Sequence, residues 1–176
     1  MVTPRVDPQV PVFALGRYAG ARRRSIVAMK DRGRTDLLAP LSRSLAVGIH
    51  RLLHWGLLDV PLTVVAAPTR GWAARQRGGD PVTRMATMAT ADHSEITVVR
   101  ALRIKALARD SAGLDSAARE RNIAGRVVLT RRRLPPGREL LLVDDIVTTG
   151  ATARESVRVL QAAGARVTAV LALAAA

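Results

Sequence analysis

Two adjacent carboxylates followed by a small, hydroxyl-rich run form the stretch of this sequence best suited to chemistry. Asp144 and Asp145 stand between the apolar residues 140–143 and the segment 147–152, which reads VTTGAT. Carboxylates attract hydrogen-bond donors and cations and repel anions, so they suit a sugar diol or a hydrated Mg²⁺. Glycine and threonine suit the opposite partner, because backbone N–H groups and hydroxyls donate to phosphate. The stretch therefore predicts a diol or metal site beside a phosphate site.

The elements around this stretch place both sites at one edge of a sheet. Residues 140–143 are typical of a strand buried on both faces, and the two aspartates are predicted to fall at its C-terminal end. Residues 151–163 carry apolar side chains at helical spacing before Gly164, which predicts a helix. Ligands of open α/β sheets bind beyond the strand ends, where the first N–H groups of a helix are unpaired. The predicted phosphate ligands are therefore Val147, Thr148, Thr149, Gly150, Ala151 and Thr152.

Strands and helices alternate along the rest of the chain. Residues 100–126 are charged and weakly patterned, which predicts a mobile loop over a site. The alternation predicts an α/β fold with a mainly parallel central sheet flanked by helices, in a single domain at residues 12–176 after an extended lead-in at residues 1–11. The predicted strands are 12–18, 62–67, 96–99, 127–129 and 166–173, and the predicted helices are 21–30, 36–55 with Asp36 as N-cap, and 81–91.

Composition limits the classes of protein to which the chain can belong. The 176 residues include no cysteine, which excludes a disulfide framework, a thiolate metal site and catalytic thiol chemistry. No apolar run reaches the ~18 residues of a membrane span. We therefore expect a soluble, cytoplasmic protein without a membrane partner.

The excess of basic residues limits the classes of binding partner that the chain is expected to have. The chain has 28 basic and 14 acidic residues and a net charge of +14, which favours nucleic acid or a small polyanion. Because only Lys30 and Lys105 are lysines, the charge also fits a bias of composition. The aromatic residues are one Phe, one Tyr and two Trp, fewer than a base-stacking surface usually carries, so the small polyanion is favoured.

The acid pair and the run after it resemble a known motif. VDDIVTTGAT, residues 143–152, is similar along its full length to the phosphoribosyl pyrophosphate (PRPP) binding motif of the type I phosphoribosyltransferases. More narrowly, the chain resembles the ComF-like family of competence proteins over roughly residues 12–174. The residues that carry this second resemblance are Arg17-Tyr18, IVAMKDRG at 26–33, the turn at Pro68 with Arg75 and Arg77, and RERN at 119–122.

The resemblance implies a role for each matched residue. Asp144 and Asp145 would hold the ribose 2′- and 3′-hydroxyls and Mg²⁺, the metal directly or through water, and residues 147–152 would hold the 5′-phosphate. Residues 100–126 correspond to the flexible loop that covers the site in that family. The implied pyrophosphate contacts are Pro68, Thr69, Arg70, Gly71, Arg75 and Arg77.

The resemblance implies an enzymatic activity, with a non-catalytic role as the alternative. The activity is Mg²⁺-dependent transfer of ribose 5-phosphate from PRPP to an acceptor with release of pyrophosphate, a glycosyl transfer of nucleotide metabolism. It needs no protein nucleophile, because Mg²⁺ and nearby arginines stabilise the charge that develops on the leaving group. The alternative is a non-catalytic, ComF-like accessory or regulatory factor in DNA uptake that binds a phosphoribosyl ligand. The sequence does not identify the acceptor, and it leaves a homodimer and contact with single-stranded DNA open.

The chain departs from the ComF-like pattern at three places. It has no cysteines for the four-cysteine zinc module with which that family commonly begins. Residues 77–80 read RGGD where the family usually has RGFN, and residues 110–113 read DSAG where a glutamine is often found. The last two departures lie in the pyrophosphate and flexible-loop segments and leave the ribose-phosphate motif intact.

Single features also have more ordinary interpretations. The acid pair is similar to that of a receiver domain, but a receiver carries its pair on the first strand, with most of the domain still to come. His50 and His54 lie four apart on a predicted helix and fit an exposed pair better than a metal site, while His93 is expected to be alone and exposed. The other ordinary assignments are packing for Trp55 and Trp72 and a solvated charge run for residues 131–133.

Overall fold

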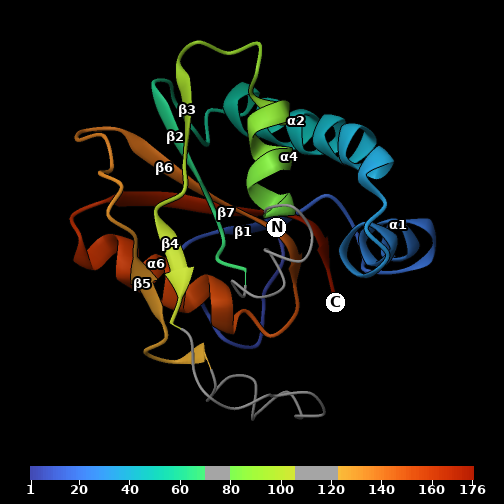
Figure 1. Cartoon of the computed structure of the whole chain (residues 1–176). Coiled ribbons are helices and arrows are strands. Elements are labelled where there is room, and N and C mark those ends of the chain that lie inside the picture. The colour runs from blue at the N-terminus through green and yellow to red at the C-terminus, as the bar shows by residue number, and fades with distance from the viewer. Residues whose placement is uncertain (70–79, 106–122) are drawn as a thin grey trace.

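A computed structural model describes residues 1–69, 80–105 and 123–176. The strands of its central sheet are β1 (Val12–Ala14), β2 (Leu62–Ala66), β3 (Ile96–Val99), β6 (Glu139–Val147) and β7 (Arg166–Ala175). All neighbouring strands are parallel, in the order β1-β7-β6-β2-β3 (Figure 1). The predicted α/β fold with a mainly parallel central sheet is confirmed.

Helices and a small hairpin cover the two faces of this sheet. The helices are α1 (Gly20–Asp31), α2 (Leu38–His54), α4 (Pro81–Ala89) and α6 (Ala151–Ala162). What we call the hairpin is the antiparallel pair of β4 (Leu102–Ile104) and β5 (Val127–Leu129). α1, α2 and α4 pack on one face, in an apolar cluster that includes Leu45, Leu141 and Leu171. α6 and the hairpin pack on the other face, in a cluster that includes Leu142 and Leu160 (Figure 1). The strands are apolar on both sides because both faces are covered.

Strand β6 is longer than its apolar run predicts. The apolar pattern predicts a strand at residues 140–143 with the two aspartates at its C-terminal end, but β6 continues through both aspartates to Val147. The reason is its neighbour β7, which continues to pair with β6 as far as Val147 opposite Ala175. Asp144 and Asp145 are part of the strand because β6 pairs with β7 as far as Val147. The loop to helix α6, which begins at Ala151, starts only after that point. The acid pair is therefore part of the sheet rather than of the loop beyond it.

The prediction of a loop over the whole stretch 100–126 is wrong, because residues 102–104 of this stretch form strand β4. Leu102 and Ile104 pair in antiparallel register with Leu129 and Val127 of β5. Leu102 is 8% exposed and Val127 is 1% exposed, so the burial of these apolar side chains on the α6 face accounts for the strand. Residues 106–122, which include the RERN segment, lie outside the described residues.

Two smaller predictions are also wrong. Asp36 does not cap α2, because its carboxylate accepts hydrogen bonds from Arg34 Nε at 2.8 Å and Nη2 at 2.6 Å, and a 3₁₀ turn at Thr35–Leu37 precedes the helix instead. Trp55 does not pack in the core, because it is the C-cap of α2 and remains 60% exposed. Arg131, Arg132 and Arg133 are exposed, as predicted. No helix in the described part of the chain has the length and apolar character needed to cross a membrane.

Candidate functional site

Strand β6 directs the two aspartates to opposite faces of the sheet. Side chains alternate along a strand, so Asp145 shares a face with Leu141 and Val143, and Asp144 shares the other face with Leu142. Leu141 and Val143 belong to the cluster under α1, α2 and α4, whereas Leu142 belongs to the cluster under α6. The pair that looks like one group in the sequence is thus two carboxylates in different surroundings.

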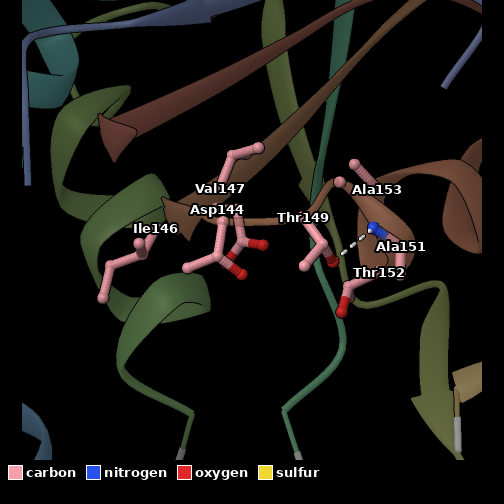
Figure 2. A pocket seen from close by; sticks show the side chains of 9 residues that line it. Asp144, Ile146, Val147, Thr149, Ala151, Thr152 and Ala153 are labelled. Carbon is pink, nitrogen blue, oxygen red and sulfur yellow. Dashed lines mark hydrogen bonds between the residues drawn. The ribbon is translucent and has the colours of Figure 1, made fainter. Parts of the chain in front are cut away.

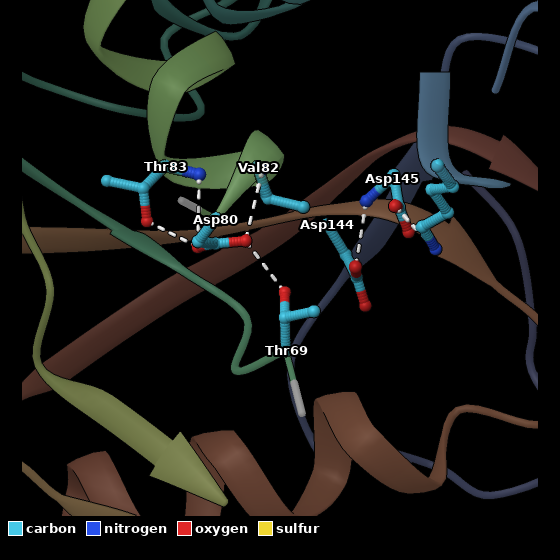
Figure 3. Close-up of polar contacts among 7 residues, drawn as sticks. Thr69, Asp80, Val82, Thr83, Asp144 and Asp145 are labelled. Carbon is cyan, nitrogen blue, oxygen red and sulfur yellow. Dashed lines mark hydrogen bonds and ion pairs between the residues drawn. The ribbon is translucent and has the colours of Figure 1, made fainter. Parts of the chain in front are cut away.

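Asp145 is held by a lysine of helix α1. Its Oδ2 atom lies 2.5 Å from Nζ of Lys30, and the two side chains are 4% and 29% exposed (Figure 3). A buried carboxylate needs a charge partner, because an unpaired ion in the protein interior costs several kcal/mol, on the order of 3–5, when its partner is removed. Lys30 supplies that partner from a helix far away in the sequence.

Asp144 is the carboxylate that faces the loop after β6. It is half-buried, and its Oδ1 accepts a hydrogen bond from the Asp145 N–H at 2.8 Å (Figure 3). Burial, and next the charge of Asp145, raise the pKa of Asp144 well above 3.8, while the charge of Lys30 acts in the opposite direction. Asp144 therefore gains from any ligand that brings it hydrogen-bond donors or a cation.

The loop after β6 leaves the start of helix α6 uncapped. Gly150 is the N-cap residue, with a φ of 89°, and it has no side chain to bond the first N–H groups of the helix. Thr149 Oγ1 accepts from the Ala151 N–H at 3.3 Å (Figure 2). The first N–H groups of a helix have no partner within the helix, and they lie at the positive end of its dipole. An anion at this point meets several free donors.

The loop and Asp144 together line one hollow. It encloses about 220 Å³, open solvent included, and Figure 2 shows the side chains around it. The hollow is lined by backbone N–H groups and threonine hydroxyls together with the Asp144 carboxylate, a combination that suits one phosphate group with part of a sugar. All six residues predicted to bind phosphate line it, namely Val147, Thr148, Thr149, Gly150, Ala151 and Thr152.

The turn after β2 is tied to the start of α4. Thr69 Oγ1 donates to Asp80 Oδ1 at 2.7 Å (Figure 3). Asp80 also caps α4, since its carboxylate accepts from the N–H groups of Val82 at 3.3 Å and Thr83 at 3.2 Å. Of the predicted pyrophosphate residues, Pro68 is buried and Thr69 half-buried beside this bond. The other four, Arg70, Gly71, Arg75 and Arg77, lie outside the described residues.

Lys30 and Asp80 are structural parts of this region that sequence reasoning missed. Asp80 had a local signal, because an aspartate before a proline at the start of an apolar helix is a typical N-cap. In the comparison with the ComF-like pattern the same residue is only a departure from RGFN. Lys30 had no such signal, since its partner Asp145 comes from a strand near the other end of the chain.

The histidines lie outside this region and differ from their prediction. His93 is half-buried and not alone, because its Nε2 lies 2.6 Å from Nε2 of His50 and the two rings meet edge to face. His50 and His54 are both exposed on α2, as expected. His93 was missed because it follows α4, which the fold packs against α2.

We predict that Lys30→Met lowers the free energy of unfolding by about 1–3 kcal/mol. The change leaves Asp145 buried without its charge partner, and the estimate is reduced from that for a fully buried pair because Lys30 is 29% exposed. Urea unfolding at pH 7.5 measures the effect. Arg34→Met is the matched control, since it breaks an ion pair with Asp36 whose side chains are 59% and 58% exposed, and it should cost clearly less stability than Lys30→Met. Equal losses in the two variants would contradict the structural role of Lys30.

Comparisons with known proteins find a similarity among solved structures but none among family models or curated sequences. No family model matches the chain, and no curated protein sequence matches it. Among solved structures, the chain is similar to a crystal structure of a hypoxanthine phosphoribosyltransferase from Staphylococcus aureus, with a TM-score of 0.43 and 13% sequence identity. The match covers 76% of this chain and 60% of that one, so this chain spans less than two thirds of the neighbour's length. The narrower resemblance to the ComF-like family rests on sequence motifs alone.

Proposed function

We propose that this protein binds PRPP and transfers its ribose 5-phosphate group to an acceptor. The observation that carries the proposal is the shared hollow: Asp144, a half-buried carboxylate, and the uncapped start of α6 line the same space. A ligand that fits both must have an anionic end and a hydroxyl-bearing end a few ångströms apart. Ribose 5-phosphate is such a ligand, and the residues concerned are those of the motif VDDIVTTGAT.

The phosphate end of this ligand belongs at residues 148–152. The N–H groups at the start of α6 donate to it, and the hydroxyls of Thr148, Thr149 and Thr152 are available at the same hollow. The carboxylate of Asp144 would repel the phosphate, which favours placing the ribose hydroxyls there. The ligand therefore has one preferred direction in the site.

We assign the ribose hydroxyls to Asp144 before Asp145. Asp144 lines the hollow, whereas Asp145 faces the opposite side of the sheet and is paired with Lys30. For Asp145 to accept from a hydroxyl as well, β6 or Lys30 must rearrange when the ligand binds. In our proposal Asp145 mainly keeps Lys30 close to Asp144.

Mg²⁺ is the expected cofactor, and Asp144 fits it as a single carboxylate ligand. In the described part of the chain, no group of three or more His, Cys, Asp or Glu side chains is arranged to hold a metal ion by itself. Mg²⁺ is commonly held by one or two carboxylates together with substrate oxygens and water. We propose that it binds with PRPP, where it neutralises charge on the pyrophosphate leaving group.

The remaining proposed contact is with the pyrophosphate. Thr69 lies where the chain leaves β2, and its bond to Asp80 ties this point to the start of α4. Since β2 and β6 are adjacent parallel strands, Thr69 and the loop after β6 lie at the same edge of the sheet. This supports a second anion-binding turn beside the ribose-phosphate hollow.

A thermal-shift titration tests the binding proposal. Ribose 5-phosphate and PRPP, the latter with and without Mg²⁺, are titrated into the protein, with ribose and inorganic phosphate as controls. A ligand at a hundred times its dissociation constant adds ~2.7 kcal/mol, or about 5–10 °C for a chain of this size. We expect shifts from ribose 5-phosphate and PRPP that the controls do not match. No shift from either compound would end the proposal.

The reaction needs a second measurement on the same protein. Pyrophosphate release from PRPP is followed with a panel of purine, pyrimidine and amine acceptors. Release that depends on one acceptor supports transfer and identifies the acceptor class. Binding without release favours the non-catalytic accessory factor, and the net charge of +14 then makes a salt-sensitive gel shift with single-stranded DNA the next test.

A further inference from the structure

The first residues of the chain form an extended segment that lies against the phosphate-binding loop. We call residues 2–10 the N-terminal strap. At its beginning, the Val2 N–H donates to the Val12 carbonyl at 2.8 Å in an antiparallel bridge beside β1. Its side chains alternate, since the odd-numbered ones are exposed and the even-numbered ones are buried or half-buried, namely Val2, Pro4, Val6, Pro8 and Val10. The alternation shows that one side of the strap is packed against the protein.

Two hydrogen bonds join the strap to the loop and to helix α6. The Val6 N–H donates to the Thr149 carbonyl oxygen at 2.8 Å. Nη1 of Arg154, in the first turn of α6, donates to the Asp7 carbonyl oxygen at 2.9 Å. Thr149 is one of the proposed phosphate residues, and Arg154 lies in the helix that begins directly after Gly150.

The strap also packs closely against Gly150. A Cβ atom at Gly150 would lie 2.8 Å from Cβ of Pro4 and would overlap the carbonyl oxygen of Val6. The absence of a side chain at this position is therefore required by the strap as well as by the φ of 89°. No strap residue lines the hollow, so the strap lies behind the loop rather than across the ligand's position.

The bond to Thr149 sets the direction of a loop donor. In a planar trans peptide the C=O of one residue and the N–H of the next point in opposite directions. The Thr149 carbonyl points to the strap, where Val6 donates to it, so the Gly150 N–H points away from the strap. Gly150 lines the hollow and no strap residue does, so the hollow also lies on the side of the loop away from the strap. Without the bond to Val6, the Thr149–Gly150 peptide plane could rotate, and the Gly150 N–H would then lose this orientation.

We propose that the N-terminal strap is a positioning segment for the phosphate site. By holding the Thr149–Gly150 peptide in one orientation, it fixes the loop N–H groups toward the 5′-phosphate before the ligand arrives. Affinity rises because the ligand does not have to order the loop. This inference rests on the proposed function for the ligand, but the restraint on the loop does not depend on it.

The variant Val6→Pro tests the positioning role of the strap by removing one hydrogen bond, that from the Val6 N–H to the Thr149 carbonyl oxygen. Proline has no N–H, so the bond to Thr149 is lost while the length and charge of the chain stay the same. Thr3→Pro is the matched control: Thr3 is an exposed strap residue, and within the described residues its N–H makes no hydrogen bond. Arg154→Met removes the hydrogen bond to the Asp7 carbonyl oxygen and leaves the strap sequence unchanged. It replaces Val6→Pro as the test variant if Val6→Pro fails to fold.

Two measurements on the folded proteins separate the outcomes. Hydrogen exchange at the amides of residues 148–152 is measured without ligand, and the dissociation constant of ribose 5-phosphate is measured by calorimetry. We expect Val6→Pro to speed exchange at these amides and to weaken binding about threefold to tenfold, as the loss of one hydrogen bond predicts, with Thr3→Pro near wild type. Arg154→Met should change both in the same direction.

Each other outcome has a definite meaning. Unchanged exchange at residues 148–152 in folded Val6→Pro overturns the restraint. Faster exchange with an unchanged dissociation constant overturns the positioning role. If the wild-type protein does not bind ribose 5-phosphate but Val6→Pro speeds exchange, the proposed function fails and the positioning role fails with it, while the restraint on the loop stands.

Discussion

Replacing Gly150 by alanine is expected to weaken the binding of ribose 5-phosphate by about 100-fold or more, which corresponds to ~2.7 kcal/mol. Two causes act together at this residue. Its φ of 89° lies in the region that side chains disfavour, at a cost of roughly 1–2 kcal/mol. The new Cβ also overlaps the carbonyl oxygen of Val6, so the loop must move. Movement of the loop displaces the N–H groups at the start of α6.

Gly164→Ala is the matched control for this prediction. Gly164 follows α6 with a φ of 81°, but apart from its own chain neighbours no atom of the described residues lies within 4 Å of the position its Cβ would take. Both variants should therefore lose roughly 1–2 kcal/mol of stability through the backbone alone, and Gly150→Ala should lose more. Calorimetric titration then separates them, since Gly164→Ala should bind like wild type. Equal binding by the two variants would show that the phosphate lies elsewhere.

Replacing Asp144 by asparagine is expected to change binding and stability in opposite directions. Binding of ribose 5-phosphate should weaken about tenfold to a hundredfold, because hydrogen bonds to a charged acceptor contribute roughly 1.5–3 kcal/mol. Stability without ligand should increase at neutral pH, because burial raises the pKa of Asp144 and the ionised form is unfavourable in the fold. An amide of the same shape avoids that cost.

The pH dependence of stability gives the sign of this effect. The folded pKa of Asp144 lies well above the value of 3.8 that an unfolded chain would show. The favourable contribution of protonated Asp144 is therefore fully present below pH 3.8, and it is lost as the pH rises through the folded pKa. Wild type should lose stability relative to Asp144→Asn between pH 4 and pH 7.5, which urea unfolding at both pH values measures. Asp92→Asn, at an exposed carboxylate, should follow wild type at both. A constant difference between wild type and Asp144→Asn would contradict the prediction.

The features that sequence reasoning predicted are those with local causes. The strand, the turn and the helix around residues 140–163 follow from an apolar run, a glycine and helical spacing, and each of these acts over a few residues. The residues that line the hollow after β6 could be located for the same reason, and their role in phosphate binding remains a prediction. The helix at Pro81 and the strand at Ile96 also have strong local patterns, and both are present within the predicted ranges.

The features that it missed depend on contacts between distant parts of the chain. The extension of β6 through Asp145 needs β7, and the separation of the two carboxylates follows from that extension. The ion pair with Lys30 needs helix α1 to pack beside β6. Nothing near Asp145 in the sequence indicates that its partner is a lysine from another element rather than a ligand. Local patterns thus locate the candidate site but do not assign its charges.

The order of strands in the sheet also determines when the site can form during synthesis. Strand β7 is the only one of the described strands that pairs with both β1 and β6, and it is made after both of them. Until Arg166–Ala175 has left the ribosome, the nascent chain can join β2 to β3 and to β6, but β1 has no partner in the sheet. Such late, long-range pairing folds slowly and leaves apolar strands exposed in the meantime. We therefore expect chains truncated before β7 to aggregate rather than to bind ligand weakly.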